Sequence, residues 1–208
     1  MSNGEVFTGI AGNYDRINRM LSLGRDAAWR RSVIVKLPPG RVLDLGAGTG
    51  AALTDLGTTE VIALDPSAEM LALNPTQMRV VGIGERLPFA DGAFDSVFSA
   101  YVFRNLDSVP ATLAEIARVL RVGGMAGVVD LGRPVATRAA AIHRAGSKAV
   151  LGAVGRMAGA ADEYRYLGES LSKLPQPEEM FTGGPLDLVE VRRMGPLGFV
   201  YGALLVKS

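Results

Sequence analysis

The chain has 208 residues, 48% hydrophobic and 21% charged, which predicts one folded α/β domain with a sizeable core. Lys and Arg (22) nearly balance Asp and Glu (21), so the net charge of +1 gives no sign of a nucleic-acid partner. The lack of cysteine excludes disulfides, thiolate metal ligands and a cysteine nucleophile. A single histidine, His143, argues against a zinc site, and we expect no metal.

Apolar, β-rich runs alternate with helical stretches along the chain. The expected strands are Arg41–Leu45, Glu60–Leu64, Met78–Gly82, Ala93–Ser99, Ala126–Leu131, Leu188–Met194 and Gly198–Val206. The expected helices are Ala51–Leu56, Ser67–Leu73 and Val109–Leu120, the last ended by Gly123 and Gly124. This rhythm is typical of a doubly wound, mainly parallel seven-stranded sheet, Rossmann-like, with an antiparallel C-terminal hairpin strand.

Two segments lie outside this core within the single domain 1–208. Residues 1–37 contain amphipathic stretches and predict a helical cover that ends at Pro38-Pro39-Gly40. Residues 134–180 predict a helical insertion between the fifth and sixth strands, rich in alanine and glycine. Its glycines are compatible with a mobile lid or with a closely packed helix. The N-terminus lacks a signal-peptide pattern, and no apolar run reaches the roughly 18 residues that span a bilayer, so we expect a cytoplasmic protein.

A glycine run follows the first expected strand. Gly46, Gly48 and Gly50 come directly after it, and glycine lets a ligand approach the bare backbone. The spacing is G-x-G-x-G, whereas a dinucleotide site shows G-x-G-x-x-G. It resembles motif I of the class I S-adenosylmethionine (SAM) methyltransferases. The run therefore predicts cofactor contacts by Gly46, Ala47, Gly48, Thr49 and Gly50; the alternative is an ordinary glycine-rich turn.

Further cofactor contacts are expected after the second and third strands. The Asp65 carboxylate, followed by Pro66, can accept hydrogen bonds from both ribose hydroxyls, and its alternative role is to cap the next helix. The backbone amides of Ile83 and Gly84, with Glu85 next to them, are expected beside an adenine edge.

Several blocks of the sequence resemble one methyltransferase family in particular, the ubiquinone/menaquinone-biosynthesis C-methyltransferases of the UbiE/MenG type. The similar blocks are Phe7–Asp15 with Asn18, Ser22, Gly24 and Trp29-Arg30, then Val42–Gly50, Leu87–Asp95, Phe103–Asp107, Val119–Gly124 and Tyr164–Ser170. The chain departs from the family pattern at Ile83-Gly84, where Asn or Asp followed by Ala is usual. It also departs at Ala51, at Ala100 and in a short helix before the sixth strand, Glu178–Gly184.

The resemblance implies methyl transfer from SAM to a ring carbon of a polyprenyl hydroquinone, with demethylmenaquinol favoured on family breadth. It implies that Arg104 activates the acceptor. Because a guanidinium is a poor base, its role would be to stabilise the developing phenolate while water carries the proton away. The alternative is an ion pair with Asp107. Asn105 is expected to orient substrate or cofactor and Tyr14 to cover the cofactor or contact the quinol; a turn role and core packing are their alternatives.

Other readings stay open at this level. An apolar, basic face of the insertion, with Ile142, Leu151 and Met157, would suit a polyprenyl tail or peripheral contact with the inner membrane surface. A homodimer is not excluded. The alternative functions are a SAM methyltransferase with another small aromatic or polyketide-like substrate, and a non-catalytic SAM-binding protein.

Overall fold

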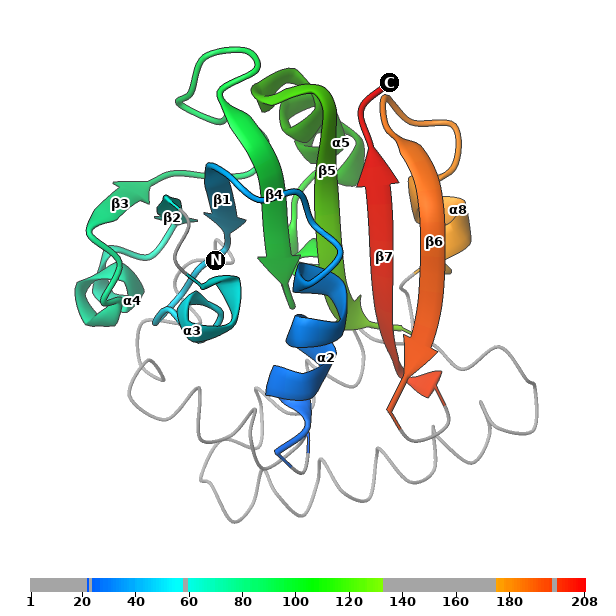
Figure 1. Cartoon of the computed structure of the whole chain (residues 1–208), viewed down its shortest axis with the longest axis horizontal. Coiled ribbons are helices and arrows are strands. Elements are labelled where there is room, and N and C mark those ends of the chain that lie inside the picture. The colour runs from blue at the N-terminus through cyan, green and yellow to red at the C-terminus, as the bar shows by residue number, and fades with distance from the viewer. Residues whose placement is uncertain (1–21, 23, 58–59, 133–174, 196–197) are drawn as a thin grey trace.

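The computed structural model describes residues 22, 24–57, 60–132, 175–195 and 198–208. They form a seven-stranded sheet in the order β3-β2-β1-β4-β5-β7-β6. The strands are β1 (Val42–Leu45), β2 (Val61–Asp65), β3 (Met78–Val81), β4 (Phe94–Ala100), β5 (Leu120–Leu131), β6 (Asp187–Met194) and β7 (Val200–Val206). β7 runs antiparallel to both of its neighbours, β5 and β6, as its reversed arrow in Figure 1 shows. The predicted fold class is confirmed.

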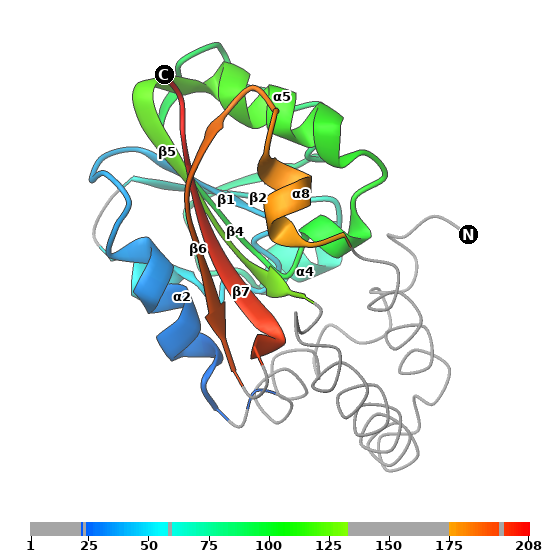
Figure 2. The same ribbon diagram turned by 90° about the vertical axis from the view of Figure 1, so that its right-hand side faces the viewer.

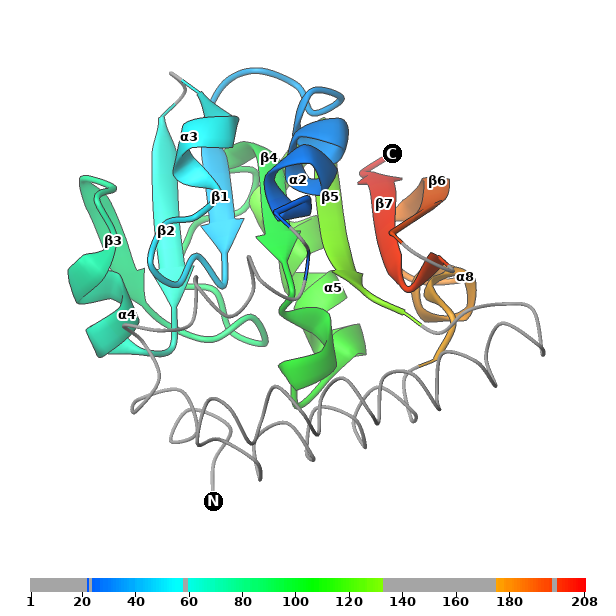
Figure 3. The ribbon, with the colours of Figure 1, turned by 90° about the horizontal axis from the view of Figure 1, so that it is seen from below.

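Helices cover both faces of the sheet (Figures 2 and 3). In Figure 3, α2 (Asp26–Ile34) and α3 (Leu53–Leu56) lie on one side of the sheet, while α5 (Val109–Val119) and α8 (Pro177–Phe181) lie on the other. A further helix, α4 (Ala68–Leu73), packs on β2 through Leu71, and a 3₁₀ turn, η2 (Phe103–Asn105), follows β4. Ser67 caps α4, because its hydroxyl accepts the Met70 N–H.

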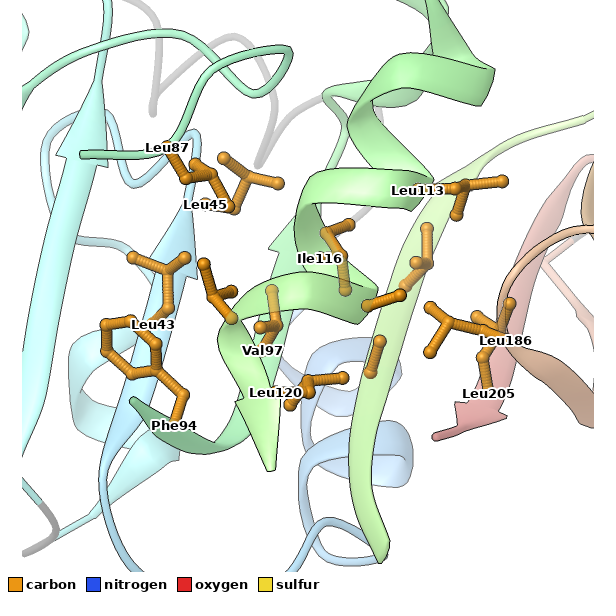
Figure 4. Packing of buried hydrophobic residues seen from close by; sticks show 14 of the residues in the cluster. Leu43, Leu45, Leu87, Phe94, Val97, Leu113, Ile116, Leu120, Leu186 and Leu205 are labelled. Carbon is orange, nitrogen blue, oxygen red and sulfur yellow. The ribbon is translucent and has the colours of Figure 1, made fainter. Parts of the chain in front are cut away.

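The core is largest on the side of α5 (Figure 4). Alternate residues of β1 and β4, among them Leu43, Leu45 and Val97, meet Leu113 and Ile116 of the helix there. A second cluster fills the other face, under α2. Since strands covered on both faces must be apolar on both sides, a charged residue inside one of them stands out.

The boundary between α5 and β5 differs from the sequence-based expectation. The helix ends at Val119, and Gly123 and Gly124 lie inside β5 rather than ending the helix. Both glycines form backbone hydrogen bonds with Lys207. The Gly123 N–H donates to the Lys207 carbonyl, and the Lys207 N–H donates to the Gly124 carbonyl. Pairing with β4 and with the end of β7 thus extends the strand backwards to Leu120, overriding the local stop signal.

Several predictions concern residues outside the described ones. These are Tyr14 and most of the cover 1–37, His143, and the insertion as far as residue 174. The expected Glu178–Gly184 helix is present as α8, shorter and beginning at Pro177. Among the residues that the structure describes, no helix is long and apolar enough to cross a membrane.

Candidate functional site

The loop after β1 has a backbone that only glycine adopts easily. Gly46, Gly48 and Gly50 have φ values of 72°, 50° and 87°, in the left-handed region. A Cβ on Gly46 would overlap Val102, and one on Gly50 would lie 2.8 Å from the Asn74 side-chain oxygen. The turn is therefore both bare and tightly enclosed, as close approach of a ligand to the backbone requires.

Asp65, the last residue of β2, and Asn74, which directly follows α4, hold this loop in place. The Gly48 N–H donates to one oxygen of Asp65 at 2.9 Å, and the Ser67 N–H donates to the other at 2.9 Å. The Asn74 amide donates to the Gly48 carbonyl at 3.0 Å. Each carboxylate oxygen still has acceptor capacity, so Asp65 can orient the loop and bind a hydroxyl at the same time.

These residues open into a cavity of about 670 Å³ at the carboxyl ends of β1, β2 and β4. This is the edge where strand order reverses between β1 and β4, the usual ligand position in open α/β sheets. All ten residues predicted to contact the cofactor line the cavity: Gly46, Ala47, Gly48, Thr49, Gly50, Asp65, Pro66, Ile83, Gly84 and Glu85. Its volume falls within the range of roughly 300–1,000 Å³ of small-molecule sites.

At one end of the cavity, the segment after β3 forms a small turn. Gly84 is buried against Thr112 of α5, and a Cβ there would meet the threonine methyl at 3.0 Å. The Ile83 side chain is half exposed. Because it is a hydrocarbon, only the backbone of this residue offers polar groups. The Glu85 carboxylate accepts the N–H groups of Asp107 and Ser108, at 2.9 and 3.2 Å. Glu85 thus ties this turn to the loop after η2.

At the other end of the cavity lie Asp26, Arg30 and Asp44, which the sequence analysis did not assign to the site. Arg30 is 7% exposed and donates to Asp26 at 2.9 Å and to Asp55 at 3.1 Å. Burial raises the pKa of Asp44 to about 7, an effect opposed by the Arg30 charge and reinforced by that of Asp65. A carboxylate inside the otherwise apolar run Val42–Leu45 was the available signal.

Strain marks the chain after β4. Tyr101 has a φ of 63°, which is unusual for a bulky residue, and its N–H donates to Val129 at 2.8 Å. This turn brings Tyr101, Val102 and Asn105 to the cavity wall. The Asn105 amide contacts the Tyr101 carbonyl at 3.5 Å.

Arg104 does not line the cavity, although its neighbour Asn105 does. Burial raises the pKa of Asp130, near the carboxyl end of β5, and the charge of Arg104 opposes this rise. The Arg104 Nε is buried and has no hydrogen-bond acceptor among the residues that the structure describes. Among the described side chains no ion pair joins Arg104 to Asp107, so the alternative role is not seen. The structure thus places Arg104 beside the cavity with an unsatisfied donor.

Comparison with known proteins gives a consistent result. The model of the ubiE/COQ5 methyltransferase family matches residues 2–183. The UbiE ubiquinone/menaquinone biosynthesis C-methyltransferase of Stenotrophomonas maltophilia is 37% identical over 85% of this chain and 78% of its own length. The demethylmenaquinone methyltransferase of Thermus thermophilus is 35% identical over 84% of this chain and 87% of its own.

Solved structures agree on the fold. A SAM-dependent methyltransferase of Thermotoga maritima superposes with a TM-score of 0.68 at 16% identity, covering 99% of this chain and 100% of its own. The phosphoethanolamine N-methyltransferase 2 of Haemonchus contortus, solved with S-adenosyl-L-methionine, has a TM-score of 0.60 at 18% identity, over 88% of this chain and 52% of its own.

Proposed function

The chain belongs to the ubiE/COQ5 methyltransferase family, and we propose that it methylates a ring carbon of a polyprenyl hydroquinone, with demethylmenaquinol as the acceptor. It is a SAM-dependent methyltransferase. The observation that carries the proposal is the cavity, in which a left-handed glycine loop and Asp65 meet at the sheet edge.

The residues of the cavity fit SAM. SAM supplies a methyl group that its sulfonium centre has already activated. Asp65 would bind the ribose hydroxyls, and the backbone of Ile83 and Gly84 would bind the adenine edge. Arg30 and Asp44 suit the amino-acid part of SAM, because Asp44 would attract its ammonium group and Arg30, already bonded to Asp26 and Asp55, would hold this charged part of the cavity in place. The bare backbone between Gly46 and Gly50 would lie along the molecule.

Arg104 is our candidate for activating the acceptor. As a permanent cation it would stabilise the phenolate form of the quinol and leave the phenolic proton to water. Its buried Nε supports this role, since an unsatisfied donor costs about 1–3 kcal/mol and an acceptor oxygen would satisfy it. Asn105, on the cavity wall, would orient the ring, and Tyr14 would cover the site.

Turnover is the test of this function. Labelled SAM is offered with short-chain demethylmenaquinol and with a benzoquinol analogue, using wild type and Arg104→Ala. We expect methyl transfer to the naphthoquinol and a large loss of kcat in the variant, with SAM affinity retained. Transfer to neither quinol would overturn the function. Full activity of Arg104→Ala would overturn the role of Arg104 alone.

Contact with a membrane surface is a separate proposal, because a polyprenyl acceptor resides in a bilayer. Its support is the apolar, basic character of the insertion in sequence, which lies outside the described residues. Flotation with liposomes that contain a quinone lipid should recover the protein in the vesicle fraction. Protein that stays at the bottom of the gradient would contradict it.

A further inference from the structure

Three polar side chains form a row across the far half of the sheet. Asp130 of β5 pairs in register with Tyr201 of β7, which pairs with Arg193 of β6. Asp130 and Tyr201 are each 1% exposed. Arg193 is held at the end of the row by Gln176 at 2.8 Å and by Glu178 of α8 at 2.7 Å. None of these residues lines the cofactor cavity.

Asp130 connects this row to the turn that carries Arg104. Its carboxylate accepts the N–H of Phe103, the first residue of η2, at 2.8 Å, and that of Leu131 at 2.7 Å. The Arg104 backbone N–H is among the groups that lower the pKa of Asp130. The carboxylate therefore fixes the backbone from which the Arg104 side chain starts.

The Arg104 guanidinium interacts electrostatically with the Asp130 carboxylate but forms no ion pair with it. The charge of Arg104 lowers the pKa of Asp130, yet no ion pair within 4.0 Å joins the two among the described residues. A direct bidentate pair would occupy the donors of Arg104. In the described part of the chain its Nε instead has no acceptor.

Charged and polar groups from two elements face Asp130. They are Arg104 from η2 and Tyr201 from β7, with Arg193 of β6 behind the tyrosine. Burial raises the pKa of Asp130, whereas Arg104 and the backbone N–H groups lower it. Burial and the Asp130 charge raise the pKa of Tyr201, so that the tyrosine stays neutral.

We infer that Asp130 is a positioning residue, which holds η2 and the Arg104 guanidinium in the geometry that activates the acceptor. The inference rests on the proposed function of Arg104. It explains why a carboxylate stands in a strand buried on both faces, where an apolar residue would otherwise be expected.

The test is Asp130→Asn, which keeps the size of the side chain and removes its charge. We expect the SAM dissociation constant to stay within about twofold and kcat with the quinol analogue to fall about tenfold or more. Because a loosened Arg104 stabilises the phenolate less, the pH at which kcat rises should move upward by about 0.5 unit or more. Asp95→Asn, at the opposite end of β4, is the matched control and should leave both unchanged.

A loss of kcat with an unmoved pH profile would indicate a merely structural role and overturn the inference, as would a downward move. If Asp130→Asn does not fold, Asp130→Glu keeps the charge and displaces the carboxylate. A fall in its kcat with normal SAM binding supports the inference, and unchanged kcat overturns it.

One further readout separates this inference from the proposed function. The Arg104 Nε–H resonance, assigned by its loss in Arg104→Lys, should shift and exchange faster in Asp130→Asn. This result in a protein that methylates no quinol would retain the positioning role and reject the function. An unperturbed resonance in an active enzyme would reject the positioning role alone.

Discussion

Three buried aspartates stand at or near the carboxyl ends of parallel strands: Asp44 in β1, Asp65 in β2 and Asp130 in β5. Their exposures are 3%, 9% and 1%. A carboxylate is costly in such strands unless hydrogen bonds or a cation compensate it. Asp65 and Asp130 accept backbone N–H groups, and Asp44 lies near Arg30. In our proposal Asp44 and Asp65 contact SAM, whereas Asp130 positions Arg104.

Asp65 is expected to contribute most to binding of the ribose. We predict that Asp65→Asn weakens SAM binding between roughly 10- and 100-fold, since a hydrogen bond to a charged group contributes about 1.5–3 kcal/mol. Isothermal calorimetry measures this, with Asp91→Asn as the control, because Asp91 is exposed and lies outside the cavity. Equal affinities for both variants would place the ribose elsewhere.

Asp44 makes stability depend on pH in the SAM-free protein. Its pKa is raised from 3.8 to about 7, so the folded state keeps a proton that the unfolded state has lost. Stability from this group is therefore present at low pH and is lost as the pH rises from about 4 to 7, by at most roughly 4 kcal/mol.

Urea denaturation at pH 5 and pH 8 measures this effect. The wild type should lose more stability than Asp44→Asn over that interval, while the variant binds SAM more weakly at pH 8. The charged groups that face Asp44, Arg30 and Asp65, are unchanged in this comparison. The same pH dependence in both proteins would show that another group is responsible.

At the scale of elements, the glycine loop depends on two distinct requirements, conformation and space. Gly46 has a φ of 72° and Val102 fills the position of its Cβ, whereas Gly57 has a φ of 77° with nothing within 4 Å. We predict that Gly57→Ala costs only the backbone strain, about 1–3 kcal/mol. Gly46→Ala should cost more and abolish SAM binding, because the loop must move.

Thermal unfolding and calorimetry on the two variants separate these requirements. Both substitutions place alanine at a positive φ, and only the one at Gly46 also overlaps Val102. If Gly46→Ala bound SAM as tightly as Gly57→Ala does, close approach of the ligand to this backbone would be ruled out.

For the whole molecule, the cavity joins residues from α2, β1, β2, β4 and the loops that follow them. A ligand that binds there stabilises only the folded state. SAM at about 100 times its dissociation constant should contribute about 2.7 kcal/mol, which raises Tm by roughly 5–10 °C for a chain of this size. Asp65→Asn should show a much smaller rise at the same SAM concentration, and an unchanged Tm in wild type would contradict the site.

The sequence by itself determined the fold class and predicted part of the cavity lining. Alternating apolar runs predicted the strands. The glycine run, Asp65-Pro66 and the segment after the third strand predicted ten of the residues that line the cavity, because that part of the lining is built from contiguous loops. Only the tertiary structure decided which residues distant in sequence come together. It moved the start of β5 to Leu120, brought Arg30 and Asp44 to the cavity, and aligned Asp130 with Tyr201 and Arg193. Such contacts join residues distant in sequence, and no local pattern encodes which strands become neighbours.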